Sequence, residues 1–120
     1  MTEELKNKLK ENGVDLNATM ARFMGMEAMY KKFLFRFTDD PDYGELKKCM
    51  ESGDVDKAYV AAHTLKGVAG NLGLGDLYAS SAALADVLRQ RGSGTEELFA
   101  KVTDNYHQIC EVIAAHKADA

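Results

Sequence analysis

Apolar side chains recur every three or four residues along most of this chain, the spacing that gives a helix one buried face. The segments that show such stripes contain Tyr30, Phe33, Leu34 and Phe37; Leu46 and Met50; Leu77, Leu84 and Leu88; and Val102, Tyr106, Ile109 and Ile113. Runs that alternate apolar and polar residues are few, and the chain has one proline. The pattern therefore predicts an all-α protein.

Residues that favour turns divide the chain into helical segments. The breaks fall at Asn12-Gly13, near Gly25, at Asp39-Asp40-Pro41, at Gly53-Asp54, from Gly73 to Gly75, and at Gly92-Ser93-Gly94. They leave two or three shorter amino-terminal helices followed by four longer segments.

Three of these breaks have the residues of helix caps. Asp40-Pro41 predicts an N-cap with proline at the first helical position, and Gly53-Asp54 predicts a helix end followed by a new cap. Ser93 with Glu96 fits a capping box. Because the connections are short, we expect an up-and-down antiparallel four-helix bundle, closed at one end by the amino-terminal helices, as a single domain over residues 1–120.

Composition narrows the possible partners. The formal net charge of -4 argues against a nucleic-acid binder, which usually gathers basic residues in a patch. The charged start of the chain has no signal-peptide core, and no window approaches the roughly 18 apolar residues of a membrane span. We therefore expect a cytoplasmic protein that binds no membrane. Cys49 and Cys110 lack the spacing of metal ligands and are interpreted as reduced thiols.

The segment from Asp54 to Leu72 divides into two faces when its residues are placed at about 100° intervals around a helix. The core side collects Ala58, Ala61, Leu65, Val68 and Leu72. His63 points the opposite way, and its face also contains Asp56, Tyr59, Lys66, Gly67 and Gly70. We expect His63 to be exposed and these glycines to clear the space around it, which costs about 1 kcal/mol for a glycine inside a helix relative to alanine.

An accessible histidine next to a lysine suits acceptance of a phosphoryl group. Neutral imidazole is a nucleophile at physiological pH, and the Lys66 amine, one turn along, can hold the anion by charge-assisted hydrogen bonding. The alternative is an ordinary solvated side chain, and that interpretation is kept for His107 and His116, which have no such surroundings.

The stretch AHTLKGVAGNLGL resembles the signature of histidine-containing phosphotransfer (HPt) domains of multistep two-component signalling. The resemblance places the phosphorylated histidine at His63, the supporting lysine at Lys66, the glycine of close approach at Gly67 and a later glycine at Gly73. GVDLNATMARFMGMEAMYKKFLFRF and ESGDVDKAYVAAH are similar to the family's lead-in segments, so the resemblance covers about residues 13 to 115.

The resemblance implies a four-helix bundle that exchanges phosphoryl groups with the aspartate of a response-regulator receiver domain, downstream of a histidine kinase. Such a carrier is not an enzyme with its own ATP site and needs no cofactor or metal, because the Mg²⁺ belongs to the receiver. We expect Tyr59, Gly70 and Leu74 to contact the partner.

The chain departs from the family at one position near the histidine. Many members have a glutamine or glutamate on the next helix that faces the imidazole, and by spacing that position is Ala85 here. Arg89, one turn further on, lies where some members have a basic residue that could assist the phosphate; an arginine in the last turn of a helix is also a favourable partner of the helix dipole.

Two related classes have a similar histidine. Phosphoacceptor domains of histidine kinases usually have an acidic residue after it and threonine or asparagine four positions on, where this chain has Thr64 and Gly67. A phosphotransfer domain excised from a chemotaxis-type or hybrid kinase stays an alternative, although Met1 favours a freestanding protein.

More distant classes fit less well. The glycines of GVAGNLGLGD lack the preceding strand of a dinucleotide site. A carboxylate-bridged metal bundle would need paired glutamates and Glu-x-x-His motifs on several helices, and the nearest approach here is the single pair of Asp104 and His107. A helical interaction module without covalent chemistry is favoured by the methionines, which suit either a core or an adaptable docking surface. They are Met20, Met24, Met26 and Met29.

Overall fold

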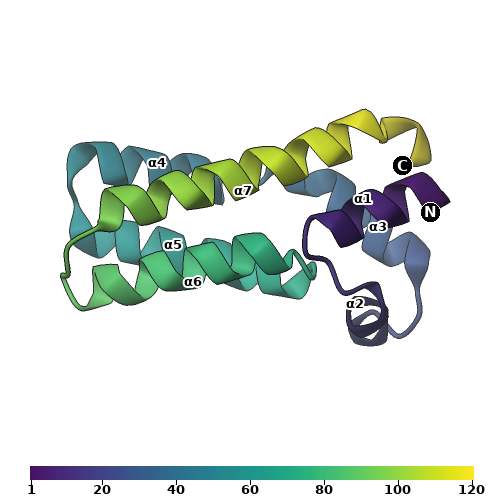
Figure 1. Cartoon of the computed structure of the whole chain (residues 1–120), viewed down its shortest axis with the longest axis horizontal. Coiled ribbons are helices and arrows are strands. Elements are labelled where there is room, and N and C mark those ends of the chain that lie inside the picture. Colours follow the sequence, from purple (N-terminus) through teal and green to yellow (C-terminus); the bar gives the residue numbers. More distant parts are fainter.

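The computed structural model describes all 120 residues, and the chain is helical throughout (Figure 1). The α-helices are α1 (Glu3–Glu11), α2 (Leu16–Arg22), α3 (Glu27–Arg36), α4 (Asp42–Ser52), α5 (Val55–Asn71), α6 (Gly75–Arg89) and α7 (Thr95–Ala115). Short 3₁₀ helices, η1 (Phe37–Asp39) and η2 (Lys117–Asp119), follow α3 and α7. The predicted all-α class is confirmed.

Helices α4 to α7 form the expected up-and-down antiparallel bundle, in which α5 packs on α4 and α6, and α6 packs on α7. Tyr43 of α4 closes the ring of helices against α7. Its hydroxyl oxygen lies 2.9 Å from Oγ1 of Thr103, and its ring stacks on Tyr106 with centroids 4.1 Å apart. The three amino-terminal helices gather at one end of the bundle (Figure 1), where the sequence predicts them.

The core is built largely from the predicted stripes. Its members with at most 1% of their surface exposed include Leu34, Leu46, Leu65, Leu84 and Ile113. The prediction that Phe33 belongs to the buried stripe of α3 is wrong, since 43% of its surface is exposed. Adjacent residues point to different faces of a helix, and Leu34 occupies the core side.

Helix ends agree with the cap chemistry at two of three sites. Gly53 ends α4 with φ +74°, and the Asp54 side chain accepts a hydrogen bond from the Lys57 amide at 3.1 Å. Helix α4 begins one residue later than expected, after Pro41 rather than at it. The capping box at Ser93 and Glu96 is wrong, because α7 begins at Thr95 after Gly94, without a side-chain cap.

Contacts with the amino-terminal helices fix the carboxyl end of α5. The buried Tyr30 hydroxyl donates a hydrogen bond of 2.8 Å to the Leu72 carbonyl, and burial raises the pKa of this phenol. Gly73 then turns the chain with φ +72°. The backbone of Val14 forms an isolated bridge with that of Leu74. The helix that contains His63 is therefore anchored at the end of the bundle.

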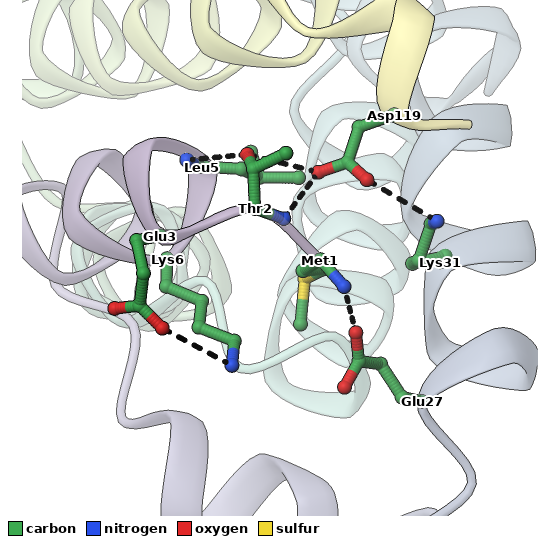
Figure 2. Close-up of polar contacts among 8 residues, drawn as sticks. All are labelled: Met1, Thr2, Glu3, Leu5, Lys6, Glu27, Lys31 and Asp119. Carbon is green, nitrogen blue, oxygen red and sulfur yellow. Dashed lines mark hydrogen bonds and ion pairs between the residues drawn. The ribbon is translucent and has the colours of Figure 1, made fainter.

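The two chain termini lie next to each other and contact side chains of α3 (Figure 2). The Met1 ammonium pairs with Glu27, while the backbone amide and hydroxyl of Thr2 donate to Asp119 at 2.8 and 3.2 Å. Lys31 lies 3.3 Å from the other oxygen of the same carboxylate. The Thr2 amide, with Lys31, lowers the pKa of Asp119. These contacts join the amino-terminal helices to the carboxyl-terminal turn.

Both cysteines are free, with Cys49 buried and Cys110 half-buried. No helix combines the length and the apolar character that crossing a bilayer requires.

Candidate functional site

His63 lies near the middle of α5 on the side turned away from the core. Ala62 and Leu65 of the same helix are completely buried, whereas His63 is exposed, as its place on the helix predicts. The imidazole stacks on the ring of Tyr59, one turn earlier, with ring centroids 5.8 Å apart and planes inclined by 28°. The histidine is therefore accessible and has an aromatic neighbour on its own helix.

A groove of about 520 Å³ between α5 and α6 brings most of the predicted site residues together. Helix α5 contributes Tyr59, His63 and Lys66. Helix α6 contributes Ala82, Ala83, Ala85, Asp86 and Arg89. The short alanine side chains on α6 leave space opposite the imidazole, while charged groups stand at the edges of the groove.

The two cations of the groove differ in their pairing. The Arg89 guanidinium lies 2.8 Å from the Asp86 carboxylate, and this hydrogen bond raises the pKa of Arg89. Arg91 forms a separate ion pair with Asp56 at 2.6 Å. No carboxylate pairs with Lys66, which lines the groove, so its positive charge is available to an anion bound next to His63.

The glycines near His63 serve two different purposes. A Cβ built at Gly67 meets nothing within 4 Å, so the backbone there faces open space. At Gly70 a Cβ would lie 3.0 Å from Cδ2 of Tyr78 on α6. The expectation that Gly70 clears space around His63 is therefore wrong, because the Tyr78 ring fills that space and Gly70 allows α5 and α6 to pack closely.

The prediction that Leu74 contacts a partner is also wrong. Only 1% of its surface is exposed, and it lies in the core at the start of α6. Gly73, the later glycine of the sequence signature, has the left-handed conformation that favours glycine and lies against the Thr19 side chain. Gly73 therefore maintains the turn after α5.

Ala85 lies in the wall of the groove, as its spacing from His63 predicts, and 3% of its surface is exposed. Its methyl group cannot hydrogen-bond to the imidazole. Asp86, the next residue, is a groove residue that sequence reasoning missed. Its position three residues before Arg89 was the available signal, since this spacing favours an ion pair on a helix.

The other two histidines lie outside the groove. His107 is exposed and meets the Tyr43 and Tyr106 rings edge-on. His116 is half-buried, and its Nδ1 lies 2.7 Å from the Val112 carbonyl oxygen. No group of three or more His, Cys, Asp or Glu side chains is placed to hold a metal ion.

Fold and groove together define an α-helical bundle that presents an exposed histidine in a groove between α5 and α6. The family model of the Hpt domain matches residues 4–113, and the chain belongs to this family. Membership assigns it a histidine phosphotransfer role in two-component signalling. A search of curated proteins and a search of solved structures each gave no match.

Proposed function

We propose that His63 is the phosphoryl acceptor and that the chain exchanges this group with the aspartate of a response-regulator receiver domain in a phosphorelay. The observation that carries the proposal is the position of the exposed imidazole in one groove with the unpaired Lys66, on a chain of the Hpt family. His107 and His116 both lie outside this groove.

The chemistry needs one nucleophile and charge stabilisation. A neutral ring nitrogen of His63 attacks the phosphorus of the receiver's aspartyl phosphate, and the bond from phosphorus to the carboxylate oxygen breaks, which returns the free aspartate. The other ring nitrogen holds the proton of the neutral imidazole. Lys66 stabilises the negative charge of the phosphoryl group, and the Mg²⁺ that the exchange uses belongs to the receiver.

Apolar side chains near the site support docking of a folded partner. Val60, one turn before His63 on α5, is 60% exposed. Met26, which caps α3, and Met29 and Phe33 of α3 are exposed at a spacing that places them on one helical face. Because Tyr30 of α3 bonds to the carboxyl end of α5, this face lies at the end of the helix that presents His63. We propose that it forms the apolar part of the receiver-docking surface.

The decisive test is incubation of the pure chain with a panel of phosphorylated receiver domains. We expect phosphate on the chain that is labile in acid and stable in base, as phosphohistidine is, and no label from ATP and Mg²⁺ alone, because the chain has no phosphate-binding glycine loop with its lysine. Rapid self-labelling from ATP would move it to the kinase class. No label from any receiver or kinase would favour an interaction module without covalent chemistry.

Lys66 supplies a graded test of the same site. Lys66→Ala should slow transfer or shorten the phosphohistidine lifetime about tenfold, the effect of losing one charge-assisted contact of about 1.5 kcal/mol. Lys66→Arg should keep much of the activity, because it keeps the charge. Lys101→Ala, at an exposed position of α7 outside the groove, is the control for a general loss of positive charge. Equal kinetics in all the variants would make Lys66 an ordinary surface charge.

A further inference from the structure

The groove leaves the orientation of the His63 ring to be explained. A histidine side chain rotates about two bonds, and a half-turn of the ring exchanges the places of a nitrogen and a carbon. Helix α6 presents Ala85 where a polar side chain could hold one nitrogen. His116 has a hydrogen-bonding partner in the Val112 carbonyl, whereas the ring of His63 forms no hydrogen bond within the chain and pairs with an aromatic ring.

That ring belongs to Tyr59, which is itself well placed. Tyr59 is half-buried and lines the groove one turn before His63, so the helix backbone sets the relative positions of the two side chains. Arg89 of α6 lines the same groove. Tyr59 thus lies in the groove beside the imidazole, on the same helix.

The form of the contact matters for the chemistry. The planes of the two rings are inclined by 28° with centroids 5.8 Å apart, within the range of offset-stacked aromatic pairs. The lone pair of an imidazole nitrogen lies in the plane of the ring, so a stacked neighbour restricts the plane and leaves both nitrogens uncovered. A hydrogen bond would occupy one nitrogen, and an edge-on contact would turn one toward the tyrosine.

We propose that Tyr59 is a positioning residue for phosphoryl transfer, which holds the His63 imidazole by stacking and performs the orienting task for which α6 offers only Ala85. The inference rests on the proposed role of His63 as acceptor. Tyr59 acts through the imidazole, and its hydroxyl is not required.

The experiment compares Tyr59→Leu and Tyr59→Phe with the unchanged chain. In Tyr59→Leu, transfer from a saturating phosphorylated receiver should slow by about two- to tenfold, the range of an aromatic pairing energy, with little change in KM. Tyr59→Phe should restore the rate, because it keeps the ring. The carbon-bound ring protons of His63 in NMR spectra should shift in Tyr59→Leu and stay nearly unchanged in Tyr59→Phe, while circular dichroism confirms that both variants fold.

The outcomes separate three explanations. A higher KM with an unchanged saturated rate would overturn the inference and make Tyr59 a residue that contacts the receiver. Unchanged kinetics in Tyr59→Leu would also overturn it. If the unchanged chain accepts no phosphate, the proposed function fails, and the positioning role fails with it. If phosphate is accepted but the His63 signals do not move in Tyr59→Leu, the positioning role alone is wrong.

Discussion

Replacing His63 with glutamine should abolish phosphoryl acceptance and leave the melting temperature nearly unchanged. Glutamine has no imidazole nitrogen with which to form the phosphorus–nitrogen bond, and the replaced side chain is exposed and outside the core. Surface substitutions of this kind usually change stability by about 0.5 kcal/mol or less. Labelling from a phosphorylated receiver measures the first effect, and thermal unfolding followed by circular dichroism measures the second.

The remaining histidines are the matched controls. His107→Gln should still accept phosphate, since His107 is exposed on α7 and lies outside the groove. His116→Gln should also accept it, although loss of the contact with the Val112 carbonyl can lower its stability. Labelling that persists in His63→Gln, or disappears in His107→Gln, would place the acceptor elsewhere.

Gly67→Gln should separate stability from function. The change removes a glycine from a helix interior where a Cβ meets nothing within 4 Å, so the free energy of unfolding should stay equal or rise by up to roughly 1 kcal/mol. Transfer from the receiver should nevertheless fall sharply, by about 100-fold if the side chain displaces the aspartyl phosphate by about 1 Å from its line of attack. Unfolding curves and single-turnover transfer kinetics measure the two effects.

Gly44→Gln is the control for a substitution at an open helical glycine. Gly44 lies in α4, a Cβ there also meets nothing within 4 Å, and α4 contributes no residue to the groove. This variant should keep normal transfer. A Gly67→Gln protein that melts at a lower temperature would indicate that Gly67 is needed for packing, and one with normal transfer would indicate that no partner approaches the backbone there.

The sequence was informative where one helix determines the result. The exposure of His63 and the open space at Gly67 depend mainly on their angular positions around α5, which the apolar residues of that helix fix. The capping of α5 by Asp54 is equally local. Spacing along α6 also located Ala85 and Arg89 correctly, because both lie in the groove wall.

Features that depend on a second element were harder to predict. Leu74 follows a turn, where helical periodicity no longer applies, and its burial accompanies a backbone bridge to Val14, which is distant in sequence and lies in the amino-terminal segment. Gly70 lies on the same face of α5 as His63 by its angular position, but the Tyr78 ring from α6 covers it. Stacking of Tyr59 on His63 required side-chain conformations that the sequence pattern does not determine.

The placement of one accessible histidine on one face of α5 determines how the donor and the acceptor can bind in the proposed relay. A phosphate donor and a phosphate acceptor need the same imidazole and the same approach past Gly67, so the two proteins cannot be bound productively together. Exchange then proceeds by alternation, with the first protein leaving before the second arrives. In the proposed relay, an excess of unphosphorylated receiver should therefore compete with the donor for His63 and slow its loading.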